Sequence, residues 1–126
     1  MDPDIKVTAP ASPDSVHVLR MVLAIVLARI GLPVDEIEDL KIALSEAAAQ
    51  LLRLESSRTI TMTISEAGGA VRLLLIADDG DRDWPPRDLE NTLAWTVLTT
   101  LATDVSFDSV DGHAQLGFAK SLSDRH

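Results

Sequence analysis

The chain has 126 residues, a length that predicts a single domain spanning residues 1–126. Apolar residues make up 46% of the sequence and charged residues 25%, which is the balance of a globular protein. Twenty Asp and Glu against eleven Lys and Arg give a net charge of −9, so nucleic acid and anionic membranes are poor partners. Because the sequence has no cysteine, disulfides, thiolate metal sites and cysteine catalysis are excluded.

The N-terminal residues do not have the basic start of a signal peptide, because Met1 to Asp4 is acidic. The longest apolar run, Met21 to Ala28, is far shorter than the ~20 residues that span a bilayer. We therefore expect a cytoplasmic protein that acts through protein partners, with no role for nucleic acid or membrane.

The first elements predicted are a strand and a helix. Residues 5–9 alternate between apolar and polar side chains, which indicates a strand. Ser12 as N-cap and Pro13 at the first helical position predict a helix that ends at Gly31. Apolar residues recur in this helix at three- and four-residue steps: Val16, Leu19, Leu23, Val26, Leu27 and Ile30.

A second helix is predicted to begin at a capping box formed by Asp35 and Glu38. Its inward-facing apolar stripe is Ile37, Leu40, Leu44, Ala47 and Leu51. A neighbouring line carries Asp39, Ala43, Glu46, Gln50 and Arg53. A polar line on a helix that is otherwise apolar indicates a surface with a function.

Residues 59–64 alternate and predict a strand, and residues 66–69 predict a hairpin turn. The near-continuous apolar run 71–77 predicts a strand that is covered on both faces. Residues 78–88 are polar and contain two prolines, so they are expected to form a loop.

The C-terminal part predicts a third helix at residues 89–102 and two strands, 105–107 and 113–122, joined by an Asp111-Gly112 hairpin turn. The inward side of this helix is expected to be Leu93, Val97, Leu98 and Leu101. The complete order of elements predicts an α+β two-layer sandwich, in which about three helices cover a mixed, mostly antiparallel sheet.

Residues 40–51 read Leu-Lys-Ile-Ala-Leu-Ser-Glu-Ala-Ala-Ala-Gln-Leu. This resembles the N-box helix of the histidine-kinase-like (GHKL) ATPases, Leu-x-x-Ala-x-x-Glu-Ala-x-x-Asn, and in particular their small anti-sigma-factor serine kinases of the RsbW/SpoIIAB type. Residues 93–105 look like the helix that follows the nucleotide lid in this family. Residues 9–13, followed by Arg20, resemble the opening strand and first helix of the family.

The resemblance implies an ATP and Mg²⁺ site and assigns roles to residues at matching positions. Glu46 corresponds to the general base that accepts the proton of an attacking serine hydroxyl, and Gln50 stands at the Mg²⁺-binding position. Asp78 and Gly80 match the loop that binds adenine. Arg20 matches an arginine that contacts the sigma factor and the anti-anti-sigma factor.

The sequence departs from the family pattern at three places around this site. Gln50 replaces the metal-binding Asn, and Arg82 replaces the second glycine of the adenine loop. The segment 92–94, Thr-Leu-Ala, stands where a phosphate-binding Gly-x-Gly is expected. Acidic side chains at Asp79, Asp81 and Asp83 add negative charge nearby. These departures predict a site that binds nucleotide weakly or not at all.

Single residues also have simpler readings that involve no ligand. Glutamate is common on solvated helix surfaces, so Glu46 could have no other role. Aspartate is common in turns, so the same holds for Asp78. Trp84 is either a packing residue or, in an exposed Pro-rich loop, a partner anchor. His17 and His113 have no further metal-binding residue at a useful spacing.

Three functional hypotheses follow. The first is an anti-sigma factor, expected to be a homodimer, that sequesters a sigma factor and is released by an anti-anti-sigma factor. The second is an active ATP-dependent serine kinase that phosphorylates that antagonist, with Glu46 as its base. The third is a non-catalytic scaffold that binds a different signalling protein. Nucleotide binding separates the first from the second, and sigma-factor binding separates the third from both.

Overall fold

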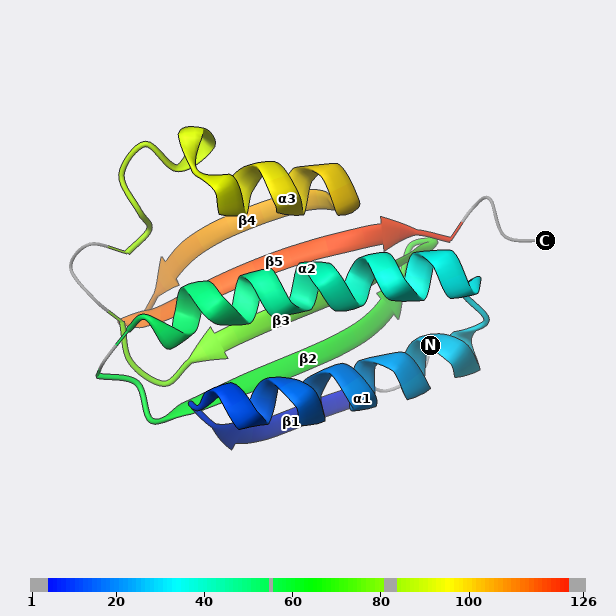
Figure 1. Ribbon diagram of the computed structural model, residues 1–126, viewed down its shortest axis with the longest axis horizontal. Coiled ribbons are helices and arrows are strands. Elements are labelled where there is room, and N and C mark those ends of the chain that lie inside the picture. Colours follow the sequence, from blue (N-terminus) through cyan, green and yellow to red (C-terminus); the bar gives the residue numbers. More distant parts are fainter. Residues whose placement is uncertain (1–4, 55, 81–83, 123–126) are drawn as a thin grey trace.

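The alternating segments of the sequence pair into one five-stranded sheet, which three helices cover on one side (Figure 1). This computed structural model describes residues 5–54, 56–80 and 84–122. The elements are β1 (Ile5–Pro10), α1 (Pro13–Ile30), α2 (Val34–Leu52), β2 (Thr59–Ala67), β3 (Ala70–Ala77), a short 3₁₀ turn (Leu89–Asn91), α3 (Leu93–Leu101), β4 (Thr103–Val110) and β5 (His113–Ser121).

The strands follow the order β1-β2-β3-β5-β4, and all four pairs of neighbours are antiparallel. The α+β two-layer sandwich is therefore confirmed. In the helical layer, α2 lies between α1 and α3, as Figure 1 shows. The predicted hairpin is also confirmed: Asp111 and Gly112 both have positive φ, 53° and 80°, as a type I′ turn requires.

The core lies between the helices and one face of the sheet. The predicted inward stripe of α2 is buried throughout, and Leu19, Leu23 and Leu27 of α1 are completely buried. In α3 the inward residues are Ala94 and Leu98, whereas Leu93, which was expected to face inward, is 74% exposed. None of the described helices is long and apolar enough to cross a bilayer.

The prediction that residues 71–77 are covered on both faces is wrong. Val71, Leu73, Leu75 and Ala77 are buried, while Arg72 is exposed. Leu74 and Ile76 lie on the same face as Arg72 and are only half-buried. No described helix covers this face of the sheet, so an apolar run does not require two covering layers here.

Two of the predicted helix starts are also wrong. The N-cap of α2 is Pro33, so Asp35 lies within the first turn and Asp35–Glu38 is not a capping box. The Asp35 carboxylate still favours the positive end of the helix dipole. The third helix begins at Leu93 rather than residue 89, because Thr92 caps it after the 3₁₀ turn. The start of α1 at Pro13 is confirmed, but the Ser12 side chain makes no capping hydrogen bond.

Candidate functional site

Glu46 and Gln50 lie one turn apart on α2, and both are half-buried. The Gln50 Nε2 donates a hydrogen bond to Glu46 Oε2 over 3.3 Å. The predicted juxtaposition of the two side chains is thus present. Because the amide nitrogen faces the carboxylate, the Gln50 oxygen points to the other side of the amide.

Asp78 follows β3 directly and binds the start of β2. Its Oδ1 accepts hydrogen bonds from the backbone N–H groups of Arg58, at 2.7 Å, and Thr59, at 3.1 Å. These bonds, with that from Thr59 the larger cause, lower the pKa of Asp78 below its ordinary value, since they stabilise the carboxylate. Asp78 is therefore an ionised acceptor that also links the two strands.

Gly80 lies against the hairpin between β4 and β5. A Cβ at this position would lie 2.9 Å from the carbonyl oxygen of Gly112 and 3.3 Å from the backbone nitrogen of Ala114. Both neighbours are backbone atoms that cannot rotate away. Packing within the chain is sufficient to explain the glycine, without a bound adenine.

The N-terminus of α3 is capped by its own chain. Thr92 Oγ1 accepts a hydrogen bond from the backbone N–H of Trp95 at 3.2 Å. The same hydroxyl donates to the Leu89 carbonyl at 2.6 Å. In a phosphate-binding helix start, the amides of the first turn are left for the ligand. Here one of them is occupied by Thr92, and the Leu93 side chain stands exposed beside it.

Trp84 is a packing residue, so the reading of it as a partner anchor in an exposed loop is wrong. Only 7% of its surface is exposed. Its ring stacks on Phe107 of β4 at a centroid distance of 5.4 Å, and its Nε1 donates to the Asp108 carbonyl over 2.7 Å. Trp95 of α3 approaches the same Phe107 at 6.2 Å. This aromatic cluster attaches the segment before α3 to β4.

The contact of Phe107 with two tryptophans could not be predicted from the sequence. A single alternating strand reveals which side of β4 faces inward, but it does not reveal which loop packs there. The only signal available was the presence of two tryptophans in a chain with 3% aromatic residues.

Arg20 lies apart from these residues, in a hollow between α1 and α2. The hollow has a volume of about 230 Å³ and is lined by His17, Arg20, Met21, Ala24 and Lys41. The Nε of Arg20 is buried and has no hydrogen-bond partner among the described residues.

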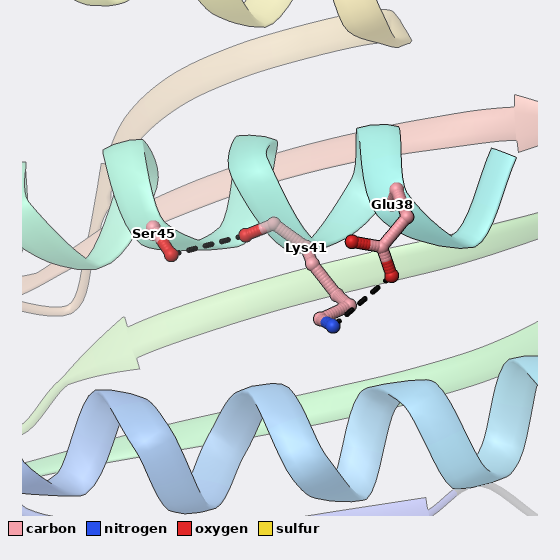
Figure 2. Close-up of polar contacts among 3 residues, drawn as sticks. All are labelled: Glu38, Lys41 and Ser45. Carbon is pink, nitrogen blue, oxygen red and sulfur yellow. Dashed lines mark hydrogen bonds and ion pairs between the residues drawn. The ribbon is translucent and has the colours of Figure 1, made fainter. Parts of the chain in front are cut away.

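Figure 2 shows how Lys41 is held on the α1-facing side of α2: its Nζ pairs with Glu38 at 3.1 Å, while Ser45 Oγ donates to its carbonyl oxygen. Glu46 lies five positions after Lys41 in the sequence, which is a rotation of about 140° around the helix. The Arg20 hollow and the Glu46–Gln50 pair therefore lie on different sides of α2.

The candidate residues form three groups: Glu46 with Gln50, Asp78 with Gly80, and Arg20 alone. Within the described ranges, no hydrogen bond or ion pair joins the first group to the second. The described residues also contain no cluster of three or more His, Asp or Glu that could hold a metal ion. The remaining predicted departures, at Asp81, Arg82 and Asp83, lie outside the described residues.

The fit of ATP and Mg²⁺ to these groups differs between the two ends of the expected site. At the adenine end, the Asp78 carboxylate is a suitable acceptor for an amine. At the phosphate end, the Thr92 side chain occupies a helix-start amide, and Thr92 and Ala94 stand in place of the two glycines. The residues at the phosphate end therefore do not fit the group.

Acid is expected to weaken the link that Asp78 makes between β2 and β3. The pKa of Asp78 is lower in the folded chain than its ordinary 3.8, so its stabilisation is present above that value. It is lost as the pH falls through the folded pKa. We expect Asp78→Ala to melt at a lower temperature than the unmodified chain at pH 6, with the difference shrinking toward pH 2.5. Equal melting temperatures at pH 6 would contradict the link.

Comparison with known proteins gives a consistent result. The family model described as "Histidine kinase-like ATPase domain" matches residues 9–120. Serine-protein kinase RsbW of Bacillus subtilis (strain 168) is 38% identical over 80 residues, covering 61% of this chain and 50% of that protein. RsbW of Bacillus licheniformis is 35% identical over 80 residues with the same coverage. The chain thus spans about half the length of the curated relatives it matches.

The crystal structure of the RsbU and RsbW domains of Rv1364c from Mycobacterium tuberculosis is similar to the present fold, with a TM-score of 0.74. The match covers 95% of this chain and 32% of that chain, at 19% sequence identity. Similarity at this level of identity shows a shared fold.

Proposed function

The chain belongs to the histidine kinase-like ATPase domain family, and from this premise we propose that it is an anti-sigma factor. It sequesters an RNA polymerase sigma factor in the cytoplasm by covering the surface that binds polymerase. The similarity to the RsbW serine-protein kinases is the observation that carries this proposal. The net charge of −9 supports it, because an acidic surface attracts basic patches on a sigma factor and speeds association.

Release of the sigma factor is part of the same proposal. An anti-anti-sigma factor competes for the chain, which acts as a homodimer. Arg20 contacts both partners. Its support is its position: Arg20 is half-buried and lines the α1–α2 hollow. A partner carboxylate would satisfy this group.

The proposed switch operates without phosphoryl transfer, because we regard the ATP site as degenerate. Three contacts support this: the Thr92 cap on α3, the Asp78 link to β2 and the packing of Gly80 on the β4–β5 hairpin. Each uses a residue at a nucleotide-site position for a contact within the chain. Competition between protein partners then remains as the means of release.

A second candidate function, a serine kinase acting on the anti-anti-sigma factor, is favoured by the Glu46–Gln50 pair and by the ionised Asp78. In that case Glu46 would accept the proton of the serine hydroxyl. Incubation of the chain with labelled ATP, Mg²⁺ and purified anti-anti-sigma proteins tests it. Label transfer that is lost in Glu46→Ala would replace the degenerate-site proposal with the kinase.

Substitution of Arg20 by Glu tests the anti-sigma proposal. We expect a sigma factor from a purified panel to bind the immobilised chain, and Arg20→Glu to weaken that binding by at least about tenfold, since a buried charged contact is reversed. Lys6→Glu is the matched control, because it makes the same charge change on exposed β1.

The two results have separate meanings. If no sigma factor binds, the anti-sigma proposal fails and the chain is a scaffold for another signalling protein. If a sigma factor binds Arg20→Glu and the unmodified chain equally, the anti-sigma proposal stands and the role of Arg20 is rejected.

A further inference from the structure

The sequence contains two Asp-Gly steps, Asp79-Gly80 after β3 and Asp111-Gly112 between β4 and β5. At such a step the backbone nitrogen of the glycine can react with the preceding carboxyl group, because glycine has no side chain that would obstruct the approach. The sequence does not distinguish the two steps. The structure does, through the contacts that their reacting groups make.

At Asp79-Gly80 the two reacting groups are already in contact. The backbone N–H of Gly80 donates a hydrogen bond to Oδ1 of Asp79 over 2.8 Å. The nitrogen is therefore held beside the carboxyl group whose carbon it would attack, an arrangement that favours a reaction within one chain. Asp79 is exposed, so water reaches the same group.

A second contact acts on the same peptide bond. The hydroxyl of Ser57 donates a hydrogen bond to the carbonyl oxygen of Asp79 over 2.8 Å. This carbonyl is conjugated with the Gly80 nitrogen, so its oxygen gains negative charge when the nitrogen gives up its proton. A hydroxyl donor directed at that oxygen stabilises the charge. Ser57 therefore makes the loss of the Gly80 proton easier.

The Asp111-Gly112 step has different surroundings. Both residues have positive φ, 53° and 80°, in the tight turn of the β4–β5 hairpin. The paired residues Val110 and His113 hold the turn on either side. Among the described residues, no hydrogen bond joins the Asp111 carboxyl group to the backbone nitrogen of Gly112. This step is therefore a comparison within the same chain.

We propose that Asp79 is a site of slow covalent self-modification, at which aspartate converts to isoaspartate through a succinimide ring. In the first step the Gly80 nitrogen forms a bond to Cγ of Asp79 in its carboxylic acid form. The carboxyl O–H group and the nitrogen proton leave together as water.

In the second step a water molecule adds to one of the two ring carbonyls, and the bond between that carbonyl and the ring nitrogen breaks. Addition at Cγ restores aspartate. Addition at the former backbone carbonyl gives isoaspartate, in which the main chain passes through the side-chain carbons. Water is the only co-reactant, and neither a nucleotide nor a partner protein takes part.

Isoaspartate is expected to disturb the contacts around residue 79. The former backbone carbonyl becomes a free carboxylate, so the Ser57 hydroxyl loses its acceptor on the main chain. Gly80 follows directly and has little room to move, since even an added Cβ would lie 2.9 Å from the Gly112 carbonyl oxygen. The modified chain should therefore melt at a lower temperature, so the reaction limits how long a copy keeps this loop in place.

Incubation of the folded chain in ¹⁸O-labelled water over several weeks tests the proposal. Each passage through the succinimide places one heavy oxygen on the residue, whether aspartate or isoaspartate forms, and peptide mass spectrometry measures each step separately. We expect label to accumulate at Asp79 at least about tenfold faster than at Asp111, because the reacting groups at Asp79 are already in contact. Fragmentation of the labelled peptide should identify isoaspartate at residue 79.

Two variants separate the contributions. Ser57→Ala should slow labelling at Asp79 by about two- to tenfold, the effect of one hydrogen bond, and leave Asp111 unchanged. Asp79→Glu keeps the charge but would need a larger ring, so it should carry no label at this position. Its melting temperature should stay constant on incubation, while that of the unmodified chain falls. Circular dichroism checks that both variants fold.

Each outcome decides a specific point. Absence of label at Asp79, or equal labelling of Asp79 and Asp111, overturns the modification site. If Ser57→Ala is labelled as fast as the unmodified chain, the assistance by Ser57 is rejected. If chains that carry isoaspartate at residue 79 melt at the original temperature, the expected effect on the loop is wrong.

Discussion

Replacement of Trp84 by alanine is expected to lower the free energy of unfolding by about 3–5 kcal/mol, the range for removal of a large buried aromatic side chain. Trp84 is 7% exposed, stacks on Phe107 and donates a hydrogen bond from Nε1 to the Asp108 carbonyl. The substitution removes all three contributions and leaves a cavity beside β4. Urea unfolding followed by circular dichroism measures the loss.

Trp84→Phe is the matched control, because it keeps an aromatic ring on Phe107 but removes the Nε1 donor. Its expected loss is smaller, about 1–3 kcal/mol for the unpaired Asp108 carbonyl. If Trp84→Ala unfolds at the same urea concentration as the unmodified chain, Trp84 does not attach the segment before α3 to β4. Other contacts would then have to hold the segment before α3 against β4.

Gly80→Ala is expected to cost about 1–3 kcal/mol, the usual penalty for forcing a methyl group into a packed site. Its new Cβ would lie 2.9 Å from the Gly112 carbonyl oxygen, so the backbone of the β4–β5 hairpin would have to shift. The hairpin holds the end of β3 and the loop that begins at Asp78. Differential scanning calorimetry should show a lower melting temperature.

Gly117→Ala provides a control within the same sheet. The nearest atom to its new Cβ is Ser106 Oγ, at 3.2 Å, and a serine side chain can rotate away. We therefore expect Gly117→Ala to be less destabilising than Gly80→Ala. The opposite ranking would show that the loop at Gly80 moves freely, and that glycine is kept there for a reason other than packing on the hairpin.

Much of the fold was predictable because an element that is buried on one face has apolar residues at a regular spacing in the sequence. The α1 and α2 stripes gave the inward faces of two helices, and Asp111-Gly112 gave the last hairpin. The apolar run 71–77 led to the wrong prediction of a strand covered on both faces. Leu74 and Ile76 are apolar although they lie on the face of the sheet that no described helix covers. The predicted capping box was wrong because the helix already begins at Val34, with Pro33 as its N-cap.

The candidate site was predictable only where its residues are close in sequence. Glu46 and Gln50 are four residues apart, so helix geometry alone places them together. The hydrogen bonds of Asp78 reach residues about twenty positions earlier in the chain, and no local pattern reveals them. The Thr92 cap was hidden for another reason: a threonine in place of a glycine signals a lost ligand contact, but not the new contact that replaces it.

The central claim is that this chain keeps the fold of the histidine kinase-like ATPase domain but uses its nucleotide-site residues for contacts within the chain. A thermal-shift titration with ATP and Mg²⁺ tests it most directly. A ligand present at ~100 times its dissociation constant adds about 2.7 kcal/mol of stability, which raises the melting temperature of a domain of this size by about 5 to 15 °C. We predict no saturable shift up to millimolar ATP. A saturable shift of that size, lost in Asp78→Ala, would contradict the claim and show that the site binds nucleotide.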